Sequence, residues 1–241
     1  MWGFSGSTVT FDRTNQINIM TILNNTNGII FGSTGLIGSN LAIKLGQLDA
    51  NLILHGNSVK KLKNLDDKFK KMKKKTILMP ADITKDDFYE KLLGTVSSRF
   101  QKIDFLINLI GRFIGLKPLT HLSHKEWHTM YELNLLSFWR VIKELEPLLR
   151  KSKGAKVIFL NNKRISEGKA YHNTLSIFNY AKYSLLKVFE KENKKFNIQT
   201  HMIEVPQLNL GLTLPLGGEK NTGQRFVEES VQEIIKKISK R

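Results

Sequence analysis

The segment GIIFGSTGLIG, residues 28–38, decides the fold. Its first four residues form an apolar run that predicts a short buried strand, and apolar residues at helical spacing follow the segment. Gly32, Gly35 and Gly38 lie between the two. Glycine lets the backbone turn sharply and approach a pyrophosphate, which the amino end of a helix stabilises. The segment therefore predicts a strand–loop–helix unit that binds a nucleotide, or one in which the glycines only allow close packing of helix on sheet.

Apolar runs and amphipathic stretches alternate along the rest of the chain. After the first helix we expect strands at 51–55, 76–79, 103–107, 156–160 and 198–205, and helices at 60–75, 86–100, 125–149, 177–192 and 228–240. Apolar strands alternating with helices predict a parallel sheet covered on both faces. Right-handed crossovers make this a doubly wound α/β fold of the Rossmann type, with about six strands. We expect residues 1–26 to be an N-terminal extension and residues 27–241 to be one domain.

The composition is that of a globular, strongly basic protein. The 241 residues are 41% hydrophobic and 24% charged, and the formal net charge is +17. The sequence has no cysteine, which excludes disulfides and thiolate metal sites, and we expect no metal. No apolar run is long enough to cross a bilayer, so we expect no transmembrane segment. The first 26 residues lack the apolar core of a secretory signal, so we do not expect secretion.

Lysine dominates the positive charge, and the predicted helix at Lys60–Lys75 concentrates it. Such a field attracts RNA, an acidic membrane surface or an acidic protein partner. Only eight of the 38 basic residues are arginine, whereas a surface built for phosphate would favour arginine. The lysine content therefore also fits the codon bias of an AT-rich genome. Basicity suggests an organellar protein on the matrix side of the mitochondrion, with the cytoplasm as the alternative.

The end of the second predicted strand indicates the type of nucleotide. An NAD site places a carboxylate here to hold the ribose 2′-hydroxyl. This chain has Asn57 and Ser58 instead, followed by Lys60 and Lys61. Lysines tolerate a 2′-phosphate, so the pattern favours NADP. The alternative is a solvated basic helix start with no ligand.

Three further segments resemble the short-chain dehydrogenase/reductase family, especially compact reductases such as the β-ketoacyl-carrier-protein reductases. They are Ala81-Asp82-Ile83, Asn108-Leu109-Ile110-Gly111 and Leu133-Asn134-Leu135, and the resemblance extends over residues 27–210. It implies that Asn134 holds a proton-relay water near the active-site lysine. It implies these cofactor-binding residues: Gly32, Ser33, Thr34, Gly35, Ile37, Gly38, Asn57, Ser58, Asp82, Ile83, Asn108, Gly111, Lys182 and Pro206.

The family's reaction uses a tyrosine and, four residues later, a lysine on the same helix face. Tyr183 and Lys187 fit this spacing literally, whereas Phe178 and Lys182 fit it with phenylalanine in place of tyrosine. The family's helix continues about four turns past its lysine. Sixteen residues separate Lys182 from Ile198, but only 11 separate Lys187 from it. We therefore assign the catalytic lysine to Lys182 and expect Phe178 at the tyrosine position, with Tyr183 as the alternative acid.

Phenylalanine has no proton to give, and general acid catalysis is typically worth about 10²–10⁴-fold in rate. Asn161 and Asn162 stand where the family has serines, and Ser166 lies in a segment whose alignment is loose. Tyr171 and His172, in the loop that follows, are further side chains that could reach the site. Gln207 replaces the family's glycine after Pro206, and we expect a truncated C-terminal end without the family's seventh strand.

Three functions remain open from the sequence. The first is a non-catalytic dehydrogenase-like subunit that binds protein partners in a larger assembly, organellar or containing RNA, and keeps NADP(H) as a structural ligand. The loss of the acid with retention of the fold favours it, because function resides in sites and not in folds. The second is an active NADPH-dependent carbonyl reductase of the 3-oxoacyl type. The third is an RNA-binding protein that uses the lysine-rich helix.

Overall fold

The structure is a computed structural model that describes residues 22–161, 168–204 and 220–240. Its centre is one six-stranded sheet in the order β3-β2-β1-β4-β5-β6, in which every neighbouring pair is parallel. The strands are β1 (Asn27–Phe31), β2 (Asn51–Gly56), β3 (Ile77–Pro80), β4 (Phe105–Asn108), β5 (Lys156–Asn161) and β6 (Gln199–Glu204). The sequence-based prediction of a doubly wound Rossmann-type sheet is therefore confirmed. Within the described ranges no strand follows β6.

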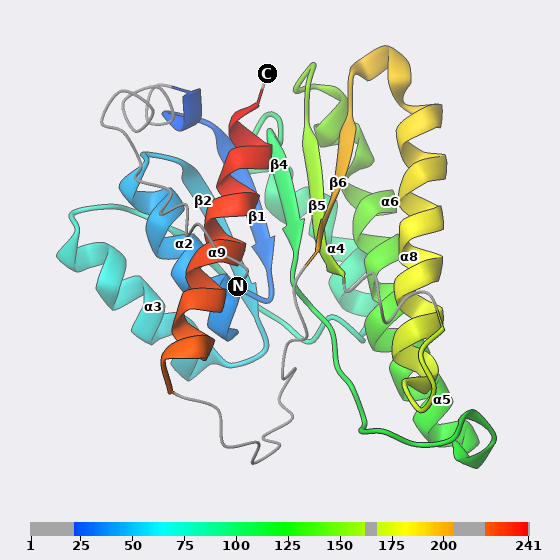
Figure 1. The fold of residues 1–241 in the computed structure, drawn as a ribbon. Helices are drawn as coiled ribbons and strands as arrows, with labels where there is room; N and C mark the ends of the chain where they lie inside the picture. The colour runs from blue at the N-terminus through cyan, green and yellow to red at the C-terminus, as the bar shows by residue number, and fades with distance from the viewer. Residues whose placement is uncertain (1–21, 162–167, 205–219, 241) are drawn as a thin grey trace, which may run out of the picture.

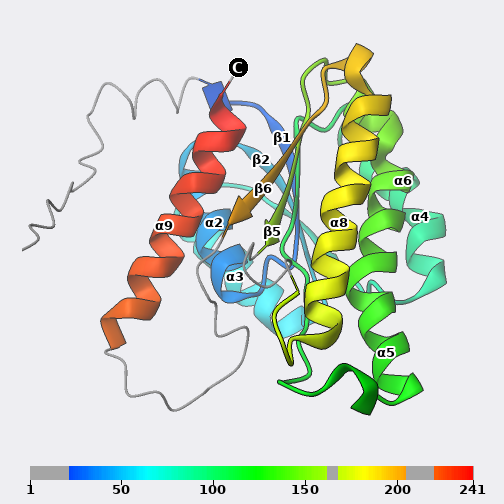
Figure 2. The same ribbon diagram turned by 45° about the vertical axis from the view of Figure 1, so that its right-hand side comes forward.

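Helices cover both faces of the sheet (Figure 1). They are α2 (Leu36–Gln47), α3 (Val59–Lys71), α4 (Asp86–Ser97), α5 (His124–Tyr131), α6 (Ser137–Arg150), α8 (Asn173–Glu192) and α9 (Lys220–Ser239). The turned view shows α2, α3 and α9 on one side of the sheet and α4, α6 and α8 on the other (Figure 2). The α5 helix lies beyond the carboxyl ends of the strands, where it meets the start of α8.

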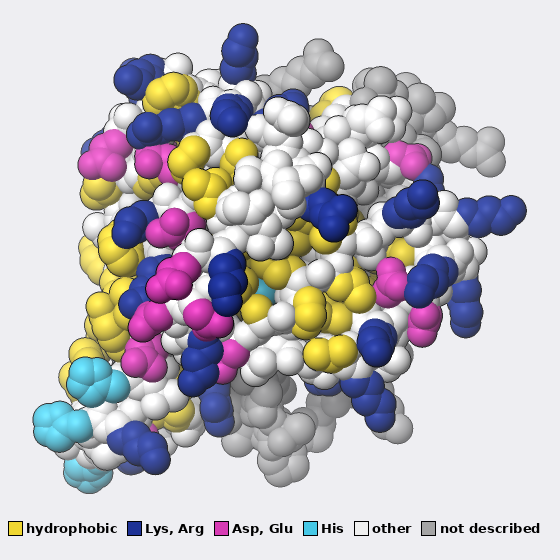
Figure 3. Space-filling model, turned by 180° about the vertical axis from the view of Figure 1, so that it is seen from behind, with side chains coloured by type: hydrophobic (Ala, Val, Ile, Leu, Met, Phe, Trp, Pro, Cys, Tyr) yellow, Lys and Arg dark blue, Asp and Glu magenta, His cyan; other side chains and the backbone are white. Residues whose placement is uncertain are grey.

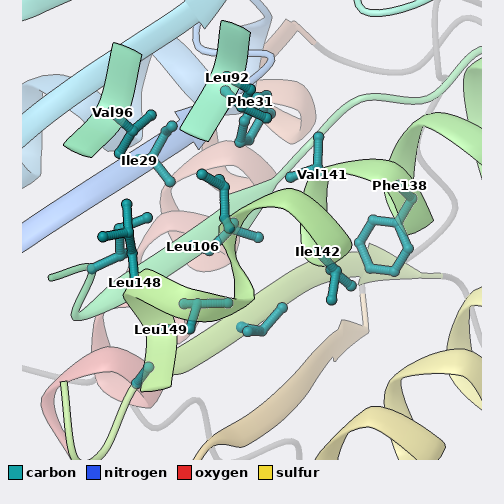
Figure 4. Close-up of a cluster of buried hydrophobic side chains, with 14 of the residues drawn as sticks. Ile29, Phe31, Leu92, Val96, Leu106, Phe138, Val141, Ile142, Leu148 and Leu149 are labelled. Carbon is teal, nitrogen blue, oxygen red and sulfur yellow. The ribbon is translucent and has the colours of Figure 1, made fainter. Parts of the chain in front are cut away.

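A hydrophobic layer fills the space on each side of the sheet. Successive side chains of a strand point to opposite faces, so a continuous apolar strand feeds both layers. In β1, Ile30 packs into the layer under α2 and α9, whereas Ile29 and Phe31 pack into the layer under α4 and α6. Figure 4 shows the second layer, in which side chains of α6 such as Val141 lie over the sheet. Because both faces of the sheet are buried, the strands do not alternate between apolar and polar residues.

Several helix boundaries differ from those predicted. The helix expected at 125–149 is interrupted by a π-helical turn, Glu132–Leu136, between α5 and α6. A π turn is a single-turn irregularity inside a helix, too short to separate from the apolar pattern of the segment at 125–149. The helix expected at 60–75 ends at Lys71, because Lys73 adopts a positive φ of 57°. The helices expected from 177 and 228 begin earlier, at Asn173 and Lys220.

Candidate functional site

The carboxyl ends of the parallel strands meet at one edge of the sheet, where open α/β sheets bind their ligands. The glycine loop follows β1, Asn57 and Ser58 follow β2, and Asp82 and Ile83 follow β3. Asn108 closes β4 and leads to Gly111. The structure thus brings the predicted cofactor residues to one edge, except Pro206, which lies outside the described residues together with Ser166.

The glycine loop is tight and is anchored to β2. The backbone N–H and the hydroxyl of Ser33 both donate to the carbonyl oxygen of His55, each at 2.9 Å. A Cβ at position 38 would lie 2.3 Å from the carbonyl oxygen of Gly32, so only glycine lets α2 start this close to the loop. No side chain caps the first turn of α2, and Gly35 is its N-cap residue. The backbone N–H groups of the first turn of α2 are therefore available to bind a phosphate group, as they would in a dinucleotide site.

The end of β2 lacks the carboxylate that an NAD site places there. A Cβ on Gly56 would lie 2.7 Å from Cγ2 of Thr34, so the last residue of the strand cannot carry a side chain without a shift. Asn57 is exposed and uncharged. The hydroxyl of Ser58 accepts a 3.3 Å hydrogen bond from the backbone N–H of Lys61 and thereby caps α3. The side chains of Lys60 and Lys61 are exposed in the first turn of that helix.

Asp82 and Asn108 fix the turns at the ends of their strands. Asp82 Oδ1 accepts hydrogen bonds from the backbone N–H of Thr84 at 3.0 Å and from its hydroxyl at 2.8 Å. The backbone hydrogen bond is the main reason why the pKa of Asp82 lies below its usual value. Asn108 Oδ1 accepts from the backbone N–H of Ile110 at 2.9 Å. Ile83 is buried in the hydrophobic layer under α4.

Asn134 lies in the π turn and holds the loop that follows β4. Its Oδ1 accepts from the backbone N–H of Arg112 at 2.8 Å, and its Nδ2 donates to the Arg112 carbonyl oxygen at 2.9 Å. The residue is buried. The side chain therefore positions the loop at Gly111 and Arg112. The water-holding role that the resemblance implied for Asn134 stays a prediction.

The two candidate pairs on α8 lie on different faces of the helix. Phe178 is 3% exposed, and Lys182, one turn later, is buried on the same face. Tyr183 is 38% exposed, and Lys187 pairs with Glu190 at 2.9 Å on the surface. The Lys187 ammonium also lies 6.0 Å from the centre of the Tyr183 ring. The pair with the literal tyrosine spacing thus faces outward, away from the buried side of α8.

Lys182 is a buried cation. Within the described residues its ammonium has no carboxylate within 4.0 Å, whereas most other lysines that form contacts do so at the surface. Burial lowers the pKa of Lys182 to about 8, because desolvation disfavours its charged form. A group with a pKa in this range can both hold and release a proton near neutral pH. Perturbed groups of this kind concentrate at functional sites.

Polar contacts connect the start of α8 to the loop between β4 and α5. Asn173 Nδ2 donates to the carbonyl oxygens of Gly115 at 3.0 Å and Lys117 at 3.3 Å, both in the loop between β4 and α5. The ring of His172 stacks on Phe113 from the same loop, with centroids 6.1 Å apart and an interplanar angle of 16°. Sequence reasoning missed Asn173. Its only signal is its residue type, because asparagine tolerates the positive φ of 37° found there.

The comparisons with known proteins place the chain in a family. A family model described as short chain dehydrogenase matches residues 26–213. The chain belongs to the short chain dehydrogenase family. It is 22% identical over 194 residues to an uncharacterized oxidoreductase of Staphylococcus aureus, covering 80% of this chain and 83% of that protein. A Listeria innocua oxidoreductase is 27% identical over 189 residues, covering 76% and 75%. The match to a Staphylococcus epidermidis oxidoreductase spans only 56% of that protein.

Solved structures share the fold of this short chain dehydrogenase. A metagenomic short-chain oxidoreductase in complex with NADP has a TM-score of 0.76 at 15% identity, covering 91% of this chain and 93% of that chain. An NADH-dependent reductase complexed with NAD has a TM-score of 0.70 at 24% identity, covering 77% and 80%. The curated relatives named above are bacterial, and they give no support to the organellar expectation.

The basic surface of the short chain dehydrogenase is partly compensated by acidic residues. On α3, Lys70 pairs with Asp66 at 2.7 Å. After the end of this helix, Lys74 pairs with Asp49. On the face drawn in Figure 3, Lys and Arg side chains are interspersed with Asp and Glu. RNA, an acidic membrane and protein partners therefore stay predictions. Among the residues described, no helix could span a membrane, and no group of three or more His, Asp or Glu could hold a metal ion.

Proposed function

We propose that this short chain dehydrogenase is a working oxidoreductase that uses NADP(H) to reduce a carbonyl group. The buried Lys182, which has no carboxylate partner within the described residues, carries the proposal. A buried ammonium costs stability unless it is compensated, and the side chain lies on the α8 face that the family uses for its chemistry. A nicotinamide ribose would supply the hydroxyl acceptors that the described residues do not. The relatives and structures cited above are named as oxidoreductases or reductases, which favours activity over a purely structural role.

The end of β2 supports NADP over NAD as the cofactor. Gly56 has no room for a carboxylate, and Asn57 carries no charge that would repel a 2′-phosphate. Lys60 and Lys61 are exposed in the first turn of α3, three and four residues after Asn57, and their positive charge favours a 2′-phosphate there. Cited structures of the same fold hold NADP in one case and NAD in another, so the choice rests on these residues.

Each part of the site has a task in this reaction. The bound cofactor supplies the hydride. The glycine loop and the open amino end of α2 hold the pyrophosphate, and Lys182 holds the ribose hydroxyls. Asn134 keeps the loop at Gly111 in place beside them. Phe178 presents only a hydrocarbon ring at the family's acid position, so the proton must come from another group.

Cofactor binding and turnover test the proposal directly. The purified protein is titrated with NADPH and with NADH by fluorescence, and NADPH oxidation is then followed with an acetoacetyl thioester and with 9,10-phenanthrenequinone. We expect NADPH to bind more tightly than NADH and at least one carbonyl probe to be reduced. Lys182→Met removes one charge-assisted hydrogen bond of about 1.5–3 kcal/mol and so weakens NADPH binding about tenfold or more. NADPH binding without reduction of either probe would support the non-catalytic alternative.

A further inference from the structure

His172, the residue before α8, has a ring whose proton can be placed from its contacts. The ring is 6% exposed, and its Nδ1 lies 2.9 Å from the carbonyl oxygen of Ala170. A carbonyl oxygen only accepts hydrogen bonds, so Nδ1 must carry a hydrogen. The other ring nitrogen, Nε2, is therefore the one that the bond to Ala170 leaves available. This is the arrangement in which a backbone acceptor holds one nitrogen and leaves the other for proton transfer.

The surroundings of His172 hold this ring in a single orientation. Phe113 stacks on it nearly parallel, and Asn173 ties the next backbone position to Gly115 and Lys117. Tyr171 and Asn173, on either side of His172, adopt positive φ values of 65° and 37°. Such backbone conformations cost energy and persist only where the surrounding contacts enforce them. These contacts fix residues 171–173 and with them the position of the imidazole at the start of α8.

A closed series of contacts links His172 to the residues of the site. Phe113, which stacks on His172, follows Arg112, whose backbone is held by Asn134. Three residues before Asn134, the ring of Tyr131 lies 6.1 Å from that of Phe178. His172 is the N-cap residue of α8, and Phe178 lies six residues later in the same helix. These contacts connect the imidazole to the loop after β4 and, through Asn134 and the α5 helix, to the aromatic cluster at Phe178.

We propose that His172 is the general acid of this short chain dehydrogenase, an inference that rests on the proposed function. As the carbonyl carbon accepts the hydride from the reduced nicotinamide, the carbonyl oxygen takes the proton from Nε2 of the imidazolium. The C=O bond becomes a C–O bond, the nicotinamide is oxidised, and the imidazole is left neutral with its hydrogen on Nδ1. Water then returns a proton to Nε2. In the direction of alcohol oxidation the neutral Nε2 accepts the proton.

Other proton donors near the site are less suited to this step. The Tyr171 side chain is 60% exposed and therefore fully solvated, and Tyr183 lies on the outer face of α8. The Lys182 ammonium is engaged by the ribose in the proposed function. Tyr131 packs its ring on Phe178, and its phenol has no hydrogen-bond partner within the described residues to orient it. Among these described side chains, His172 alone combines burial, a ring fixed by two contacts and a ring nitrogen left available for proton transfer.

Two substitutions of His172 separate its chemistry from its structural contacts. In His172→Asn the side-chain amide nitrogen falls near the position of Nδ1, so the hydrogen bond to Ala170 is kept while Nε2 is lost. In His172→Gln the amide nitrogen falls near Nε2, so a hydrogen bond can form there but no proton can be given up. Tyr171→Phe is the matched control, since it removes a neighbouring phenol. NADPH affinity and the far-ultraviolet spectrum report whether each variant folds.

The readout is the rate of hydride transfer in a single turnover, with NADPH bound and 9,10-phenanthrenequinone or the acetoacetyl thioester as probe. We expect both His172 variants to lose about 10²-fold or more of this rate, with NADPH affinity changed less than about twofold. We expect the solvent deuterium isotope effect of the wild type to be absent from the residual rate, and Tyr171→Phe to retain activity. An unchanged rate in His172→Asn, with turnover intact, would overturn the assignment of His172. Absence of NADPH binding or turnover in the wild type would instead refute the proposed function.

Discussion

The ring of Phe178 lies edge-on against that of Trp127, with centroids 5.4 Å apart, on the same buried face of α8 as Lys182. The arrangement explains how a chain without the family's phenol keeps its helix in place. Aromatic rings meeting edge to face contribute about 0.5–1.5 kcal/mol beyond their buried area. Tyr131 adds a second contact to the same ring. Residue 178 therefore anchors α5 to α8, and its removal and its replacement by tyrosine have different consequences.

Phe178→Tyr is expected to raise the rate of NADPH-dependent carbonyl reduction. The added hydroxyl is para to the bond that attaches the ring, so the contacts with Trp127 and Tyr131 need not change. It provides a second proton donor next to Lys182, and we expect the single-turnover rate to rise about tenfold or more. Phe178→Leu is the control, which should lower the free energy of unfolding by roughly 1–2 kcal/mol through lost packing and give no gain in rate. A rate for Phe178→Tyr equal to that of the wild type would show that the substrate does not lie beside residue 178.

Much of the fold and part of the site could be predicted from the sequence, for physical reasons that can be named. Parallel strands that are buried on both faces are continuous apolar runs, so β1 and β4 can be recognised in the sequence alone. The glycine spacing at Gly32 to Gly38 reports a close approach of backbone to backbone, which a Cβ would prevent. The relation of Phe178 to Lys182 follows from the 3.6-residue period of a helix.

The remainder depends on contacts between distant segments. Asn134 bonds the backbone of Arg112, 22 residues away, and Asn173 bonds Gly115, 58 residues away. Backbone acceptors leave no signature in a sequence, so these roles are not readable from residue types. The tautomer of His172 likewise follows from the carbonyl of Ala170 and not from its own spacing. Asn173 also starts a helix whose first turn, with Thr174 and Ser176, has the composition of a loop.

Lys182→Met is expected to stabilise the cofactor-free protein at neutral pH. The pKa of Lys182 is lowered from 10.5 to about 8 in the folded state. At pH 7 the lysine is charged in both states, so folding carries the full cost of burying the charge, roughly 3 kcal/mol. Between pH 8 and 10.5 the unfolded chain binds more protons than the folded one, so the stability of the wild type rises with pH. Urea unfolding should therefore show the advantage of Lys182→Met at pH 7 and little difference near pH 11. Lys187→Met, on the exposed face of α8, serves as the control and should show no such pH dependence.

The residue after β2 is expected to control the choice between NADPH and NADH. Asn57→Asp places a carboxylate where a 2′-phosphate would lie, so NADPH should bind at least tenfold more weakly while NADH binds as well or better. Gly56→Asp is not equivalent, because a Cβ there would lie 2.7 Å from Thr34 Cγ2. We expect that variant to lose roughly 1–3 kcal/mol of stability through overpacking. Fluorescence titration with both cofactors checks the first expectation, and urea unfolding checks the second. Equal loss of NADH and NADPH affinity in Asn57→Asp would contradict the proposed place of the 2′-phosphate.

His55 is expected to make the fold sensitive to acid. Its ring lies between Phe31 and Phe88, with centroids 5.1 and 5.4 Å away. Within the described part of the chain, neither ring nitrogen has a partner at good hydrogen-bond geometry. Burial lowers the pKa of His55 from 6.5 to about 4. Below pH 6.5, His55 binds a proton in the unfolded chain but stays neutral in the folded chain. The free energy of unfolding therefore falls as the pH drops from 6.5 towards 4, by roughly 3 kcal/mol in all. His55→Leu should remove this part of the pH dependence in urea unfolding between pH 7 and 4, whereas His128→Leu, at an exposed position on α5, should leave it unchanged. If the wild type and His55→Leu lost the same free energy of unfolding over this range, protonation of a group other than His55 would be the cause of the acid sensitivity.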